Sequence, residues 1–164
     1  MTNYYPLALG NEWQYKQKDG TIYSNKITVA TANQFTMYNS AANKTSVVKT
    51  DGILITTDVL EEGNFQPWLT NDLKTGDNWV VKFKVNGLDC MLVMTVRETG
   101  VSKVIGGITY KNVLFVEAEN KVMINDSLVP LNFFTQYYYA DGIDLVLTTS
   151  SAGDAHSLIS YKLN

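Results

Sequence analysis

Hydrophobic and polar residues alternate with a period of two along most of the chain. The clearest alternation covers residues 79–97, where apolar side chains occupy every second position on both sides of an Asn86-Gly87 pair. A period of two places the apolar side chains on one face of a β-strand. Asn-Gly is the strongest short signal for a two-residue hairpin turn. We therefore predict a β-hairpin over residues 79–97 with one buried face.

Glycine-containing pairs mark further turns, because glycine adopts positive φ at little cost. These pairs are Asp19-Gly20, Asp51-Gly52, Gly106-Gly107 and Asp141-Gly142. Between them, the pattern predicts strands at 12–18, 21–31, 34–39, 45–50, 53–58, 109–120, 131–140, 143–149 and 156–163. The short connections favour antiparallel neighbours. The predicted fold is all-β: a single curved antiparallel sheet, a half-barrel or barrel of about ten to twelve strands, with little or no helix.

Helix signals are weak. Residues 58–62 are compatible with one helical turn, which Gly63 and Asn64 would stop. Residues 63–78 contain Pro67 and Gly76, and we predict an irregular connection there.

A ten-residue phrase occurs twice, at residues 7–16 and 73–82. Its pattern is Leu-x-x-Gly-[Asn/Asp]-x-Trp-x-x-Lys, and each copy leads into an alternating segment. The repeat suggests two related halves, about 1–66 and 67–164, within a single β-domain that spans residues 1–164.

Composition excludes several classes of function. The chain of 164 residues is 45% hydrophobic and 18% charged, which is typical of one globular domain. Its net charge of −3 and isoelectric point near 5.1 provide no basic field for nucleic acid. No apolar run reaches the roughly 18 residues of a transmembrane segment. The first residues of this chain also lack the basic and apolar regions of a signal peptide.

Four phrases resemble a loose group of bacterial extracytoplasmic β-domains, many of them lipoproteins of unassigned function. The phrases lie at residues 5–15, 107–113, 138–146 and 158–163. The resemblance implies a curved half-barrel similar to lipoprotein carriers, an extracytoplasmic location and no catalytic residues. One departure is Asp144, which stands where the group usually has glycine, and it puts in doubt a close approach of backbone or ligand at that position.

Candidate catalytic chemistry is sparse. The chain has one cysteine and one histidine, so it offers no internal disulfide and no multi-histidine zinc site. We assign no catalytic residue, no metal ligand and no cofactor. Glu117 and Glu119 fall on one face of a predicted strand, about 6.5–7 Å apart, which leaves a glycan-active enzyme with paired carboxylates as an alternative.

An aromatic run is the best candidate for binding. Adjacent positions of a strand face opposite ways, so one set of its side chains is either covered by a second layer or displayed. We predict a ligand-binding role for Phe133, Phe134, Tyr137, Tyr138 and Tyr139. The function expected is a non-catalytic binding or structural module that holds an apolar small molecule, a lipid or a glycan on a concave sheet face. A protein–protein interaction module with a filled core is the other alternative.

Overall fold

The computed structural model describes residues 2–164, which form one antiparallel sheet of twelve strands and contain no helix. This confirms the predicted all-β fold class and the curved, barrel-shaped sheet. The strands are β1 (Glu12–Gln17), β2 (Ile22–Ala30), β3 (Gln34–Asn39), β4 (Lys44–Thr50), β5 (Leu54–Thr57), β6 (Gln66–Thr70), β7 (Asn78–Val85), β8 (Leu88–Ile105), β9 (Ile108–Ile124), β10 (Ser127–Ala140), β11 (Asp144–Ser150) and β12 (Ala155–Lys162).

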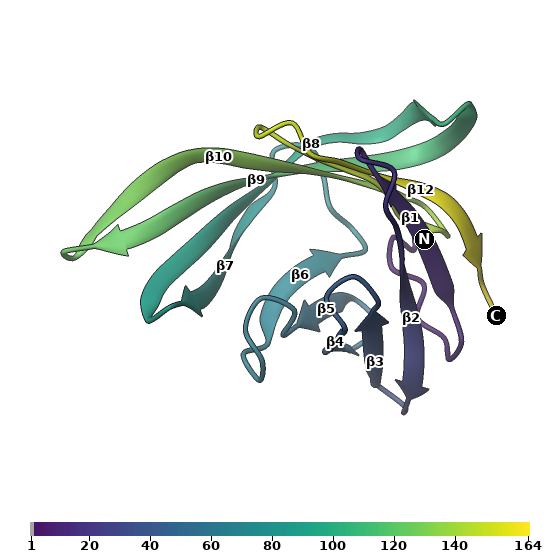
Figure 1. The fold of residues 1–164 in the computed structure, drawn as a ribbon, viewed down its shortest axis with the longest axis horizontal. Helices are drawn as coiled ribbons and strands as arrows, with labels where there is room; N and C mark the ends of the chain where they lie inside the picture. Colours follow the sequence, from purple (N-terminus) through teal and green to yellow (C-terminus); the bar gives the residue numbers. More distant parts are fainter. Residues whose placement is uncertain (1) are drawn as a thin grey trace.

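The sheet consists of two meanders that curve around a common interior (Figure 1). Its spatial order is β6-β5-β4-β3-β2-β1-β12-β11-β10-β9-β8-β7. Strands β1 to β6 form the first meander and β7 to β12 form the second. Within residues 2–164, β1–β12 is the only ladder between strands that are not consecutive in the sequence. The curvature brings β6 close to β7, so the barrel is nearly closed.

The hairpin predicted over residues 79–97 is confirmed and extends further than the prediction. Val85 pairs with Leu88 across a turn in which Asn86 and Gly87 both have positive φ, 50° and 78°. β8 continues to Ile105, beyond the predicted end. A second turn without glycine, at Asn125 and Asp126, joins β9 to β10, and the pattern of glycine pairs did not reveal it.

One local prediction was wrong, and one open alternative is resolved. The segment 63–78, expected to be irregular, contains β6, whose Trp68 and Leu69 are buried in the core. Residues 58–62 form no helical turn, because the Asp58 carboxylate organises a loop instead. Its oxygens accept the backbone N–H groups of Val47 at 2.7 Å and Gly63 at 3.0 Å, which ties the loop to β4.

The two copies of the repeated phrase adopt the same turn. Gly10 and Gly76 have φ of 84° and 94°, a region that favours glycine. The Gly10 N–H donates to the carbonyl of Ile27 and the Gly76 N–H to that of Val96, both at 2.9 Å. The following carbonyl, of Asn11 or Asp77, accepts the N–H of the same partner residue. Each copy therefore starts a strand by the same backbone bonds, while the two-halves interpretation stays a prediction.

Two hydrophobic clusters of buried residues form the core. Trp68, Met94 and Leu114 belong to the first, and Trp13, Tyr15 and Val113 to the second. The N-terminal segment packs against both clusters through Tyr5 and Leu7. This packing places the N-terminal segment, β1, β6 and β10 around an interior cavity.

Candidate functional site

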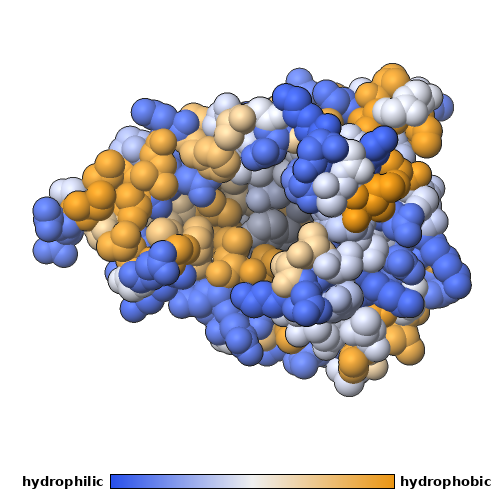
Figure 2. All heavy atoms as spheres, in the orientation of Figure 1, coloured by the Kyte–Doolittle hydropathy of each residue, from blue (hydrophilic) through white to orange (hydrophobic). Residues whose placement is uncertain are grey.

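A cavity of about 150 Å³ lies inside the barrel. Figure 2 shows the face of the molecule that is hollowed at its centre, where the surface is neutral in hydropathy. The cavity wall combines aromatic rings with amide, hydroxyl and carboxyl groups. It is formed by Tyr5, Trp13, Tyr15, Asn25, Met37, Asn39, Ser46, Thr57, Val59, Trp68, Tyr137, Tyr139, Asp144 and Leu145. Such a mixed wall suits a small molecule that has both apolar and polar parts.

Asp144 is the only acidic residue in this wall, and it is held in an unfavourable position. The residue is 5% exposed, and its φ of 101° is one that non-glycine residues rarely adopt. Such strain costs about 1–3 kcal/mol. Among the described residues, the carboxylate accepts one hydrogen bond, from the N–H of the adjacent Leu145 at 2.6 Å. A buried carboxylate with so few donors is a further cost to folding.

The backbone on both sides of Asp144 is fixed by aromatic side chains of β1. The Trp13 indole N–H donates to the Ile143 carbonyl at 2.6 Å. The Tyr15 hydroxyl donates to the Leu145 carbonyl at 2.9 Å. Because these two acceptors flank Asp144 in the chain, the two side chains of β1 fix the backbone that carries the carboxylate.

The cavity favours uncharged forms of its ionisable groups. Burial raises the pKa of Asp144 to about 8, opposed in part by the Leu145 N–H. Burial also raises the pKa values of Tyr5, Tyr15 and Tyr139, and the nearby Asp144 carboxylate adds to each of these shifts. The described lining contains no lysine or arginine that could neutralise the carboxylate. Burial therefore keeps Asp144 largely protonated at neutral pH.

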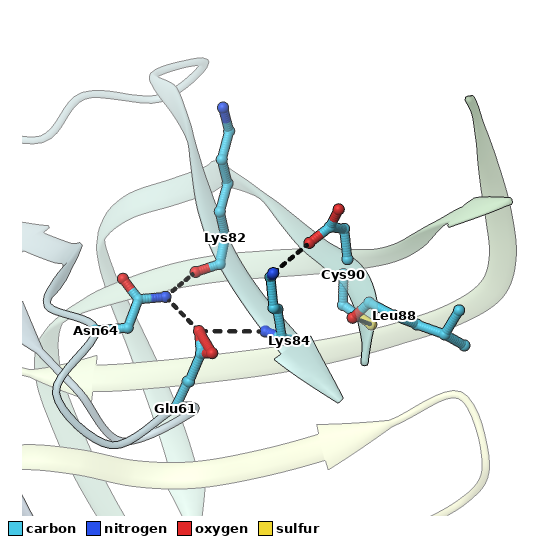
Figure 3. A network of polar contacts seen from close by, with 7 residues as sticks. Glu61, Asn64, Lys82, Lys84, Leu88 and Cys90 are labelled. Carbon is cyan, nitrogen blue, oxygen red and sulfur yellow. Dashed lines mark hydrogen bonds and ion pairs between the residues drawn. The ribbon is translucent and has the colours of Figure 1, made fainter. Parts of the chain in front are cut away.

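The opposite side of the barrel, between β6 and β7, is closed by side chains. No backbone ladder joins these two fully described strands. Instead, the Lys82 N–H donates to Gln66 Oε1 at 3.0 Å, and the Lys82 carbonyl accepts Asn64 Nδ2 at 2.9 Å. Figure 3 shows Asn64 between Lys82 and Glu61, and Glu61 Oε1 accepts the Lys84 N–H at 3.3 Å. Side-chain amides and a carboxylate thus make the hydrogen bonds to β7 that a neighbouring strand would otherwise make. We call this boundary between β6 and β7 the seam.

A groove of about 440 Å³ runs along the seam beside two tryptophans. Trp68 lines both this groove and the interior cavity, and its indole N–H donates to the Tyr139 hydroxyl at 3.0 Å. Trp79 lines the groove from β7. Its indole nitrogen is buried, and no hydrogen-bond acceptor for it occurs within residues 2–164. The indole N–H of Trp79 at the seam therefore lacks the kind of hydrogen bond that the indole N–H of Trp13 makes at β1.

A second groove, of about 410 Å³, lies between the seam and the long hairpins. Phe83, Met91, Met123 and Leu128 supply its apolar lining. Figure 2 shows hydrophobic side chains gathered toward the left, over the ends of these hairpins. The exposed apolar residues near the two hairpin turns at that end are Val85, Leu88, Ile124, Leu128 and Leu131. An apolar surface thus leads from the hairpin ends toward the seam.

The predicted aromatic run is divided between the two faces of the sheet. Tyr137 and Tyr139 line the interior cavity. Tyr138 lies on the other face, stacked on Phe115 with ring centroids 4.5 Å apart, under the ammonium group of Lys103. Phe133 and Phe134 lie half-buried at the irregular pairing between Pro130 and Phe134. A ligand-binding role for the five residues stays a prediction, and the structure brings two of them to the cavity.

Glu117 and Glu119 are occupied by neighbours on their strand and on adjacent strands. Glu117 Oε1 accepts two bonds from the Arg97 guanidinium, at 3.2 Å and 3.0 Å, and Glu117 Oε2 accepts Gln136 Nε2 at 3.0 Å. Glu119 pairs with Lys121 at 3.9 Å. Neither carboxylate lines the interior cavity. No cluster of three or more His, Cys, Asp or Glu suited to a metal ion occurs in residues 2–164, and no helix there is long and apolar enough to cross a membrane.

Sequence reasoning missed the polar part of the cavity. Asp144 was noticed only as a departure from glycine, and Tyr5, Asn25 and Asn39 were not singled out. One signal was available for Asp144, because it lies two positions after Gly142 and opens an apolar strand, where an acidic residue is unusual. The convergence of Tyr5, Trp68 and Asp144 depends on contacts between distant segments, so local pattern could not reveal it.

Comparison with known proteins identifies the fold. No family model and no curated protein matches the chain. A structure from Bacteroides fragilis, described as an exported protein with a YmcC-like fold, is 11% identical, has a TM-score of 0.58, and aligns over 99% of this chain and 100% of its own. A structure from Parabacteroides distasonis, described as a lipoprotein, is 11% identical, has a TM-score of 0.57, and aligns over 98% and 99%. The expected resemblance to bacterial extracytoplasmic β-domains is thus confirmed at the level of the fold.

Proposed function

We propose that this chain is a non-catalytic binding module that takes a small amphiphilic molecule into the interior of the barrel. The observation that carries the proposal is the cavity of about 150 Å³, walled by aromatic rings and one buried carboxylate. A module that served only as a filled structural core would gain stability by closing this space, because a cavity forfeits packing contacts.

The seam supports a route into the cavity. Side chains close it, and the hydrogen bonds to Lys82 and Lys84 lie at exposed positions. Such bonds open at lower free energy than a buried backbone ladder does. The apolar groove of Phe83, Met91 and Met123 lies beside the seam, where it could receive the hydrocarbon part of the same ligand.

An extracytoplasmic location is part of the proposal. The two proteins of similar fold are described as an exported protein and a lipoprotein. A binding module in that compartment would carry or present a hydrophobic compound across an aqueous space. A glycan-active enzyme finds less support, since the hydrogen bonds and ion pairs of Glu117 and Glu119 leave no free carboxylate pair in a cavity.

Binding of an uncharged apolar probe tests the proposal. N-phenyl-1-naphthylamine gains fluorescence in apolar surroundings, and we expect saturable binding to the native protein. Ser46 lines the cavity, and Ser46→Phe should fill it and weaken binding at least ~10-fold. Thr45 is exposed one position earlier on β4, so Thr45→Phe is the matched control and should bind as the native chain does.

Two results would contradict the proposal. One is the absence of saturable probe binding to the native protein. The other is equal binding by the native chain, Ser46→Phe and Thr45→Phe, which would place the probe outside the cavity. Denaturation curves for both variants establish that each is folded before binding is compared.

A further inference from the structure

One acidic group remains unexplained by the packing of the barrel. Asp144 is only 5% exposed, has a φ of 101°, and lines the cavity. A second buried aspartate, Asp58, shows what a structural carboxylate looks like in the same chain. Both oxygens of Asp58 accept backbone N–H groups, whereas the Asp144 carboxylate receives only the N–H of Leu145. Within residues 2–164 the other Asp144 oxygen accepts no hydrogen bond, and the residue lines the cavity.

Aromatic rings from three strands line the cavity together with Asp144. Trp13 and Tyr15 come from β1, Trp68 from β6, and Tyr137 and Tyr139 from β10. Aromatic faces attract organic cations, most strongly where water is excluded, and quaternary ammonium groups are recognised by such cages. A carboxylate within the cage adds a compensating charge. A neutral ligand would leave the carboxyl group protonated and would gain no such charge pairing.

We propose that the cavity recognises a small organic cation of the alkylammonium type, with its charge met by Asp144 and its carbon atoms by the surrounding Trp and Tyr rings. This inference rests on the proposed function, since it names the ligand class of the same cavity. The cation is either a free metabolite or the headgroup of a lipid. The groove beside the seam would take the chains in the second case.

Proton release provides a signature that packing alone would not produce. The titratable groups facing Asp144 are Tyr5 of the N-terminal segment, Tyr15 of β1 and Tyr139 of β10, and burial raises the pKa of each. Tyrosines with raised pKa values stay neutral at pH 7, so Asp144 is the group that must ionise when a cation binds. Because its pKa is raised to about 8, binding at pH 7 should expel most of one proton per site.

Calorimetric titration with choline and its uncharged isostere 3,3-dimethylbutan-1-ol tests the inference. We expect choline to bind at least ~10-fold more tightly than the isostere, with proton release detected by comparing two buffers of different ionisation enthalpy. Asp144→Asn should abolish the preference and the proton release. Asp144→Gly also removes the carboxylate, and glycine adopts the φ of this position readily. This variant should therefore lose the preference and the proton release as Asp144→Asn does, which shows that the loss comes from the missing charge and not from misfolding. Asp58→Asn is the matched control and should keep both properties.

A lipid arm separates the two sources of the cation. Lysophosphatidylcholine binding that exceeds choline binding and is lost in Asp144→Asn supports a lipid headgroup. Choline binding of equal strength supports a free metabolite. Equal affinity for choline and 3,3-dimethylbutan-1-ol, or unchanged choline binding in Asp144→Asn, would overturn the inference. So would the absence of choline and lysolipid binding while N-phenyl-1-naphthylamine still binds, and in that case the proposed binding module would stand.

Discussion

The two meanders of the sheet meet at two junctions, and across the described residues only the β1–β12 junction has a backbone ladder. β1 pairs with β12 from Glu12↔Lys162 to Gln17↔His156. At the seam, Asn64, Gln66 and Glu61 supply side-chain partners to the backbone of β7. The strands on the two sides of the barrel begin alike, because Gly10 and Gly76 form the same turn.

The difference shows that the same strand start does not determine how a strand edge is completed. At the seam, Pro67 removes one backbone donor from β6, and Lys82 and Lys84 occupy β7. Proline and lysine are residues that keep edge strands from pairing. The tryptophans follow the same division: Trp13 is 1% exposed with its N–H bonded, whereas the Trp79 nitrogen has no partner in residues 2–164. One junction is therefore joined by a backbone ladder and the other by side-chain hydrogen bonds.

The largest expected effect separates the two tryptophans. Trp13→Ala should lower the free energy of unfolding by about 3–5 kcal/mol, since it removes a fully buried side chain and a hydrogen bond. Trp79→Ala should cost only about 1–2 kcal/mol, because that side chain is half-buried at the seam. Urea denaturation monitored by circular dichroism measures both. Equal losses would mean that the two junctions contribute alike to stability.

A smaller effect concerns Asp144. Its pKa is raised to about 8 in the folded state, so the native protein holds the proton more tightly than the unfolded chain does. The stability from this protonation is complete below about pH 4 and is lost as the pH rises to about 8. The free energy of unfolding of Asp144→Asn, relative to that of the native chain, should therefore rise by roughly 2 kcal/mol or more between pH 4 and pH 8.5.

The measurement is the free energy of unfolding of the native chain and of Asp144→Asn at both pH values. Asp58→Asn provides the control, because its carboxylate accepts two backbone N–H groups. This variant should be less stable than the native chain at pH 8.5, the opposite sign to Asp144→Asn. A difference between native chain and Asp144→Asn that does not change with pH would show that the cavity tolerates the charged carboxylate.

The smallest effect on stability, and a distinct one on kinetics, is expected at the seam. Asn64→Ala combined with Gln66→Ala removes the side-chain bonds to Lys82 and should change stability by only about 1 kcal/mol. Release of N-phenyl-1-naphthylamine, followed by stopped-flow fluorescence, should become several-fold faster. Gln14→Ala is the matched control at the β1–β12 junction, where its bond to Ser160 is backed by the ladder. If Gln14→Ala accelerates release as much, the seam is not the route.

Local pattern predicted the parts of the fold that local residues determine. The 79–97 hairpin was evident because alternation and Asn86-Gly87 agree on one register. β6 was missed because it is short, contains Pro67 and buries the consecutive residues Trp68 and Leu69 without alternation. The cavity was beyond local reasoning, since the Trp68–Tyr139 hydrogen bond joins residues 71 positions apart. Tyr137 and Tyr139 belong to the predicted aromatic run and line the cavity, but a period of two could not indicate which face of β10 encloses it.

The β1–β12 ladder also has a consequence for how the chain folds. Every other ladder in residues 2–164 joins strands that follow one another, so each can form as a local hairpin. Gln14 and Ser160 are 146 positions apart, and their strands can pair only after both meanders exist. Contacts of such sequence separation carry a loop-closure cost and slow folding. We expect the two meanders to form early and the meeting of β1 with β12 to be the slow event that completes the barrel.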